Sequence, residues 1–165
     1  MEAVIRAVTN REELRNSARV IRRSFRTVAV EFGLTRENCP AHPSFQTLAG
    51  LIERQTKQVV FFGQFLGEKQ IGFVAMERAD QDTYYLERLA VLPERRHHGC
   101  GAALVDFVLR TARQRGAARV SLSMIDEHTV LREWYKRMGF VETVTRRFEH
   151  LPFTVCYMER ELADL

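Results

Sequence analysis

Apolar residues follow strand-like alternation and helical spacing, which divide the chain into short strands and amphipathic helices. Strands are predicted at residues 3–8, 59–66, 70–77, 84–92, 119–124, 141–148 and 153–160. Helices are predicted from about 10 to 32, after residue 44, directly after the loop at 96–101, and around 131–138. The order β, α, α, β, β, β, α, β, α, β, β predicts an α/β or α+β fold, a mixed sheet with helices on both sides. It differs from a doubly wound nucleotide fold, in which strand and helix alternate throughout.

Polar residues and glycines mark where the helices begin and end. Asn10 is the predicted N-cap of the first helix, with Glu13 placed as in a capping box, and Gly33 closes this helix. Ser44 is the predicted N-cap of the second, shorter helix. Thr47 stands where a capping box would have Glu or Gln, so the second helix has the weaker start signal.

The stretch Tyr84–Leu109 joins a strand, a proline turn, a basic glycine loop and a helix. Pro93 ends the strand because proline brings no N–H donor. Glycines in the loop Arg96–Gly101 allow a sharp turn and a close approach to a ligand. The start of the following helix offers unpaired N–H groups and the positive end of its dipole. We therefore expect this loop to bind a phosphate or pyrophosphate.

Composition limits the class of protein without identifying it. A chain of 165 residues with 45% hydrophobic residues favours one domain, residues 1–165, with a sizeable core. No apolar run approaches the roughly 20 residues that span a bilayer, and the N-terminus lacks a signal-peptide core, so a cytoplasmic protein is expected. The cysteines, Cys39, Cys100 and Cys156, have no paired spacing and disfavour a disulfide framework. The net charge of +4 is a mild basic excess.

Two separate segments carry a family resemblance. RRHHGCGAAL resembles the acyl-CoA-binding loop of the GNAT superfamily of N-acetyltransferases, a pattern that Arg96, Gly99 and Gly101 fill. REWYKRMGF resembles the later helix of that family, and Tyr135 and Gly139-Phe140 match it. The strand LERLAVLP before the loop is also similar. The resemblance implies a GNAT-like mixed, mostly antiparallel sheet. It also implies transfer of an acetyl group from acetyl-CoA to a primary amine of a small molecule or peptide, by direct attack in a ternary complex.

The resemblance also implies a set of cofactor contacts. N–H groups from His97 to Ala102 would bind the pyrophosphate, with Arg96 adding charge, and the backbone of Ala90 and Val91 would meet the pantetheine arm. The predicted cofactor-binding residues are Ala90, Val91, Arg96, His97, His98, Gly99, Cys100, Gly101, Ala102 and His128. His128 stands where the family often has Asn, which weakens the transfer of that side-chain contact.

Tyr135 and Glu87 are the predicted catalytic residues. The family's matching tyrosine lies near the cofactor sulfur and can protonate the departing thiolate; the alternative is that Tyr135 is only a core aromatic. Glu87 lies on the strand that should border the site and is the candidate general base; a glutamate paired with an arginine explains it equally well. No metal is expected, because adjacent histidines such as His97-His98 do not easily chelate one ion. Nothing in the sequence gives Cys100 a partner base.

Other functions stay open at this stage. A non-catalytic acyl-CoA-binding regulatory module on the same fold is the main alternative. Nucleic-acid binding is disfavoured, because the arginines at 110, 113, 115 and 119 have no interleaved aromatics. Dimers are common in the family, which allows a homodimer here.

The amine acceptor is expected to be selected by the first two helices, the loop Leu34–Pro43 and the connection Phe148–Phe153. These loops contain Glu37 with His42 and Glu149 with His150, respectively. Such residues could contact the acceptor, but exposed loop charge explains them as well.

Overall fold

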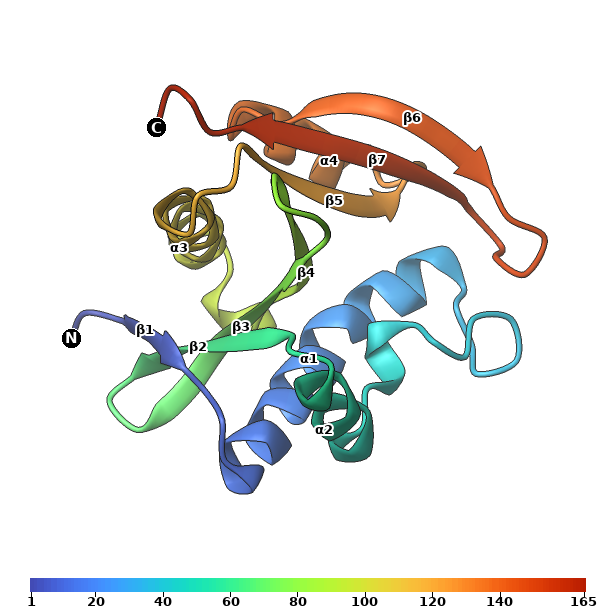
Figure 1. Cartoon of the computed structure of the whole chain (residues 1–165). Coiled ribbons are helices and arrows are strands. Elements are labelled where there is room, and N and C mark those ends of the chain that lie inside the picture. Colours follow the sequence, from blue (N-terminus) through green and yellow to red (C-terminus); the bar gives the residue numbers. More distant parts are fainter.

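The computed structural model describes residues 1–165, which form one seven-stranded sheet with helices on both faces (Figure 1). The strands are β1 Val4–Ala7, β2 Val60–Leu66, β3 Lys69–Arg78, β4 Thr83–Val91, β5 Arg119–Ile125, β6 Val141–Arg147 and β7 Thr154–Glu161. The helices are α1 Arg11–Phe32, α2 Leu48–Thr56, α3 Cys100–Gln114 and α4 Thr129–Arg137, with short 3-10 turns at Pro43–Phe45 and Pro93–Arg95. The predicted order of strands and helices is confirmed.

The sheet order is β1-β2-β3-β4-β5-β7-β6, and every neighbouring pair is antiparallel except β4 with β5. This mixed, mostly antiparallel sheet confirms the predicted fold class. The parallel pairing joins only Thr83–Tyr85 to Arg119–Ser121. Beyond it β4 continues beside β3 while β5 continues beside β7, so the two central strands diverge (Figure 1).

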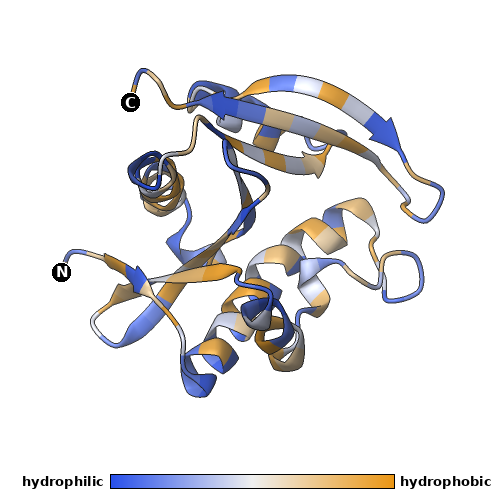
Figure 2. Cartoon of the chain, in the orientation of Figure 1, coloured by the Kyte–Doolittle hydropathy of each residue, from blue (hydrophilic) through white to orange (hydrophobic).

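Two hydrophobic cores lie on opposite faces of the sheet. One core joins α3 and α4 to strands β2, β3, β4, β5 and β7, and the other joins α1 and α2 to strands β2, β3 and β4. The outer strand β6 has two valines among hydrophilic residues and is exposed along its whole length (Figure 2). None of the helices is both long and apolar enough to span a membrane.

The helix boundaries agree with the predictions at α1 and differ at α2. Asn10 Oδ1 accepts a hydrogen bond from the Glu13 N–H at 2.9 Å, and Gly33 ends α1 with φ +64°. The prediction that Ser44 caps the second helix is wrong: Ser44 lies inside the turn Pro43–Phe45, and Thr47 caps α2 by accepting from the Gly50 N–H at 3.0 Å. Pro43 is well suited to open a turn, and this turn stops before the helix begins.

Candidate active site

A β-bulge interrupts β4 close to the point where it leaves β5. Glu87 faces Ala75 and Ala90 faces Phe73, so Arg88 and Leu89 together oppose a single residue of β3. Arg88 has φ +51°, a left-handed conformation that bulky residues rarely adopt. Bulges of this kind redirect side chains and often lie beside active sites.

The diverging strands open into a cleft of about 1340 Å³, bordered by α1, the turn at Pro43, α3, α4 and the β6–β7 hairpin. Every predicted site residue lines this cleft except Ala90 and His98. Ala90 is only 1% exposed, between β3 and the core, and His98 points to solvent with its Nδ1 2.7 Å from the Arg96 carbonyl oxygen. The sequence therefore identified residues that the fold gathers from distant positions.

The glycine loop presents a run of free N–H groups at the start of α3. His97 and Gly99 have φ +64° and +81°, which turns the backbone sharply before the helix. None of the N–H groups from His97 to Ala102 donates to another protein group, and the first that does, from Ala103, bonds the Gly99 carbonyl at 3.0 Å. These groups, together with the helix dipole, favour an anion.

Arg96 fastens the loop to α1. Its guanidinium donates to the Ser24 carbonyl oxygen at 2.8 Å and to Thr27 Oγ1 at 3.1 Å. Burial lowers the pKa of Arg96. Ser24 also contacts the end of β4, because its Oγ accepts a hydrogen bond from the Val91 N–H at 3.2 Å. Sequence reasoning missed Ser24, since nothing in the helical pattern of α1 distinguishes it from a small core residue.

Tyr135 lies on α4, is 5% exposed, and borders the cleft. Its ring packs against Trp134 at 5.1 Å and Phe140 at 5.5 Å between centroids. Burial raises the pKa of the Tyr135 phenol, so the hydroxyl stays protonated near neutral pH. The residue is thus both a core aromatic and a protonated group at the edge of the cleft.

Glu87 faces the cleft and is held by two arginines. Its carboxylate pairs with Arg54 of α2 and lies 3.6 Å from Arg88 Nη1, and Arg54 also lies 3.6 Å from Glu77. The arginine partner that the sequence left open is therefore present. Arg54 could not be assigned from sequence, because α2 and β4 meet only in the folded chain.

His128 and Cys100 have structural partners at the edges of the cleft. His128 is the N-cap of α4, and its Nδ1 accepts from the Leu131 N–H at 3.4 Å. Burial lowers the pKa of His128. Cys100 begins α3, and its carbonyl oxygen accepts from Gln64 Nε2 at 3.4 Å.

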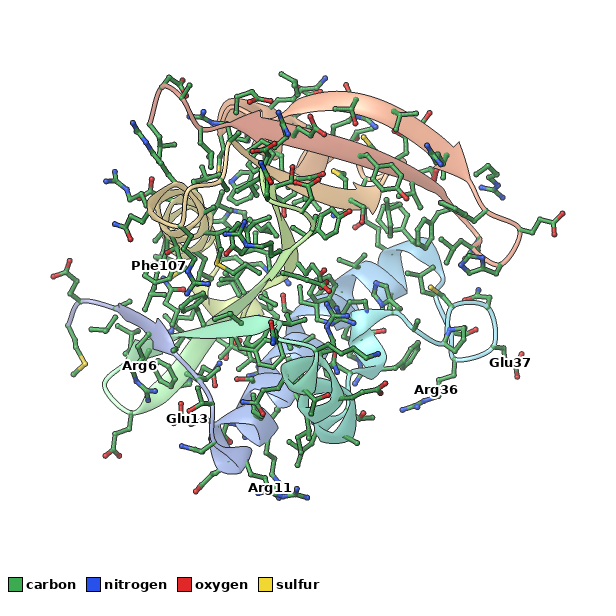
Figure 3. All side chains as sticks on the ribbon, in the orientation of Figure 1. Arg6, Arg11, Glu13, Arg36, Glu37 and Phe107 are labelled. Atoms are coloured by element: carbon green, nitrogen blue, oxygen red, sulfur yellow. The ribbon has the colours of Figure 1, made fainter.

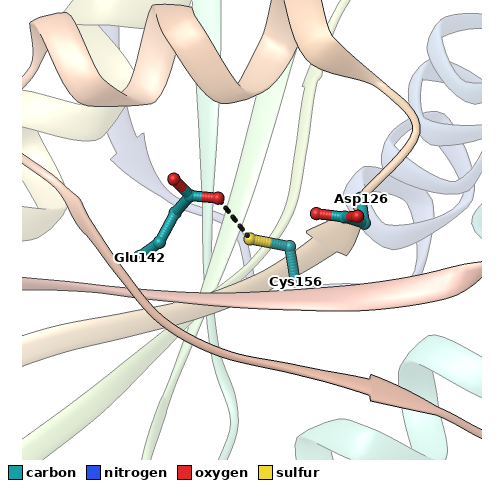
Figure 4. Close-up of side chains that lie close together, drawn as sticks. All are labelled: Asp126, Glu142 and Cys156. Atoms are coloured by element: carbon teal, nitrogen blue, oxygen red, sulfur yellow. Dashed lines mark hydrogen bonds between the residues drawn. The ribbon is translucent and has the colours of Figure 1, made fainter.

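A second cluster of charged residues holds α4, and with it Tyr135, against the sheet. Asp126, Glu142 and Cys156 have their polar atoms within 4.8 Å of one another (Figure 4). Arg132 pairs with Asp126 at 2.7 Å and with Glu142 at 3.6 Å, and Lys136 pairs with Glu142 at 2.9 Å. Cations of the protein thus neutralise both carboxylates, and the cluster connects α4 to β6 and β7.

One face of the cleft carries polar side chains that the sequence did not single out. Ser121 of β5 pairs with Tyr85 of β4 and with Glu159 of β7, so these three lie on one face of the sheet. All three line the cleft. By contrast, Glu37 projects outward from its loop (Figure 3) and does not line the cleft, which agrees with exposed loop charge.

Comparison with known proteins identifies the family. Residues 26–140 match the model of the acetyltransferase (GNAT) family, which is most of the chain, and the chain therefore belongs to this family.

An uncharacterized N-acetyltransferase of Mycobacterium tuberculosis is 33% identical over 78 residues, which are 47% of this chain and 50% of that relative. The chain thus spans about half the length of the curated relatives that it matches.

Solved structures show the same fold over almost the whole chain. The PaiA N-acetyltransferase of Thermoplasma acidophilum, in complex with coenzyme A, has a TM-score of 0.81 and 21% identity, covering 98% of this chain and 99% of that one. The ribosomal-protein-S18-alanine N-acetyltransferase of Escherichia coli has a TM-score of 0.77 and 18% identity, covering 98% and 94%.

Proposed function

We propose that this chain is an acyl-CoA-dependent N-acetyltransferase. It transfers the acetyl group of acetyl-CoA to a primary amine of a small molecule or peptide by direct attack in a ternary complex. The observation that carries the proposal is the run of unpaired N–H groups from His97 to Ala102, which borders the same cleft as Tyr135. Family membership and the coenzyme A complex of the Thermoplasma neighbour support it.

The residues of the loop fit the pyrophosphate of coenzyme A. Free N–H groups, two glycines and a helix N-terminus suit an anionic ligand, and Gly99 takes a left-handed conformation that favours glycine. The proposed holding residues that line the cleft are Val91, Arg96, His97, Gly99, Cys100, Gly101, Ala102 and His128. Contacts from Ala90 and His98, which do not line it, stay predictions. Arg96 holds the loop against α1 and adds positive charge beside it. When bound, acetyl-CoA supplies an activated thioester carbonyl to the cleft.

Side chains of the protein donate and accept the protons that the reaction moves. We assign Tyr135 as the proton donor for the departing thiolate, because its phenol is protonated and lines the cleft. The acceptor amine must lose a proton, since free alkyl ammonium groups have pKa values near ~10.4. Glu87 is the proposed proton acceptor, fixed in place by Arg54 and Arg88. Proximity in the cleft supplies much of the remaining rate.

Two assays test the proposal. A thermal shift on saturation with acetyl-CoA tests binding, because a ligand of the folded state stabilises it. Release of free thiol across a panel of amines then tests transfer. The neighbour named for ribosomal-protein alanine justifies peptide amines in the panel, beside small-molecule amines. Stabilisation without thiol release from any amine would support the non-catalytic acyl-CoA-binding module. A cytoplasmic location and a homodimer stay predictions.

A further inference from the structure

His42 is a buried histidine with one ring nitrogen free, and it lines the cleft beside α1. It is 8% exposed and packs edge-to-face on Phe25, with 5.7 Å between ring centroids. Its Nδ1 accepts a hydrogen bond from the Ser44 N–H at 3.2 Å and lies 2.7 Å from Ser44 Oγ. These contacts fix the ring at the start of the turn Pro43–Phe45.

The contacts at Nδ1 determine which nitrogen carries the proton. A backbone N–H can only donate, so Nδ1 must present a lone pair. Burial lowers the pKa of His42 to about 4, so the ring is neutral at pH 7 and its single proton lies on Nε2. Two side-chain polar atoms are fully buried without a hydrogen-bond partner, Arg54 Nε and Gln64 Oε1. Nε2 of His42 also has no hydrogen-bond partner in the protein, but it is not fully buried. It is therefore accessible, and His42 lines the cleft.

A hydrogen bond connects the turn beside His42 to the bulge of β4. Gln46, which follows this turn, accepts a hydrogen bond at its Oε1 from Arg88 Nε at 2.7 Å. Arg88 lies beside Glu87 and lines the same cleft. Burial, followed by the charge of Arg54, lowers the pKa of Arg88 to about 10, so its guanidinium remains charged at neutral pH. This end of the cleft thus presents an N–H donor and a cation, and both favour an oxygen ligand.

We propose that Nε2–H of His42 binds a carbonyl or carboxylate oxygen of the acceptor, and that the acceptor is an amino acid or peptide rather than a simple alkylamine. This inference rests on the proposed function. The apolar ring of Phe25 and the side chain of Phe153, which also line the cleft, give such an acceptor a surface for its side chain.

Phenylalanine, phenylalaninamide and phenethylamine form a matched series of probes, because they share one aromatic tail and differ only at the oxygen group. The first readout is the ¹⁵N spectrum of the His42 ring in the acetyl-CoA-saturated protein. We expect the Nε2–H tautomer at pH 7, and a change in its signal on adding phenylalaninamide or phenylalanine but not phenethylamine. An Nδ1–H tautomer, or a His42 signal that responds to neither oxygen-bearing probe, would overturn the inference. This readout does not depend on turnover.

The second readout is kinetic and uses a substitution that separates the two ring nitrogens. His42→Asn keeps an oxygen that can cap the turn but removes Nε2–H. It should lower kcat/KM for phenylalaninamide about tenfold more than for phenethylamine, as expected for one lost hydrogen bond. A larger effect on phenylalanine than on its amide would identify a carboxylate as the preferred oxygen. Glu68→Gln, in the exposed turn between β2 and β3 and outside the cleft, is the control.

The outcomes separate this inference from the proposed function. Acetylation of amines with equal losses for both probes in His42→Asn would overturn the role of His42 and leave the acetyltransferase in place. Absence of thiol release from every amine would overturn the proposed function, while the ¹⁵N response would still decide whether His42 binds an oxygen ligand.

Discussion

Replacing Tyr135 with Phe removes one hydroxyl and leaves the aromatic packing of α4 in place. The ring contacts with Trp134 at 5.1 Å and Phe140 at 5.5 Å do not involve the hydroxyl. The structure records no hydrogen bond from the Tyr135 hydroxyl, so no protein group loses a partner. We expect the free energy of unfolding to change by less than about 1 kcal/mol.

The expected kinetic effect is much larger. Loss of a positioned proton donor lowers the rate by about 10²- to 10⁴-fold, which corresponds to about 3–5 kcal/mol of transition-state stabilisation. Burial raises the pKa of Tyr135, so its active, protonated form persists to high pH. The wild-type rate should therefore not decline below about pH 10 through loss of the Tyr135 proton.

The assay is steady-state thiol release at saturating acetyl-CoA, with thermal denaturation of each variant as a folding control. Tyr84→Phe is the matched control, because Tyr84 is 4% exposed in the same core but does not line the cleft. Tyr135→Phe with wild-type turnover would refute the assignment. Equal losses in Tyr84→Phe and Tyr135→Phe would show that the effect is one of packing.

Three further predictions concern Glu87, His42 and Gly139. Glu87→Gln removes the proposed proton acceptor but keeps the size of the side chain, so the acidic limb of the pH–rate profile should be lost; an unchanged profile would exclude Glu87 as the base. The pKa of His42 is depressed from 6.5 to about 4, so its contribution to stability is complete above pH 6.5 and is lost as the pH falls toward 4. Urea unfolding of wild type should thus lose about 2 kcal/mol more between pH 7 and pH 5 than unfolding of His42→Asn, and equal losses would contradict the burial argument. Gly139→Ala would place a Cβ against Arg160 Nε at a residue with φ +93°, so it should destabilise the protein by more than about 1 kcal/mol in the same urea assay, and unchanged stability would contradict this geometry.

Local patterns were enough to predict the order of the elements and several of their ends. Asn10 and Gly33 bound α1 as predicted, because capping depends on neighbours within one turn. The Ser44 prediction failed because a 3-10 turn and a helix start share the same local signals, and only the fold shows that Thr47 is the cap. Local sequence therefore predicts that a helix exists better than it predicts the residue at which it begins.

The site was predictable where a motif is contiguous and unpredictable where strands diverge or bulge. The glycine loop was found from its residues and Tyr135 from the family resemblance, and both border one cleft, except that His98 of the loop does not. The face of Glu87 could not be decided by alternation, because the bulge at Arg88 breaks the two-residue period. Its partner Arg54 comes from a distant segment, which no local pattern contains. His42 is oriented locally by Ser44, but its burial against Phe25 depends on the fold.

Mass spectrometry of a complete reaction tests the central claim most directly. The purified protein would be incubated with acetyl-CoA and the amine panel, and free coenzyme A, N-acetylated amine and intact protein would be quantified together. Direct transfer predicts equal amounts of free coenzyme A and acetylated amine, with the protein mass unchanged. Bound acetyl-CoA that yields no acetylated amine, or an acetyl group left on the protein, would contradict the account.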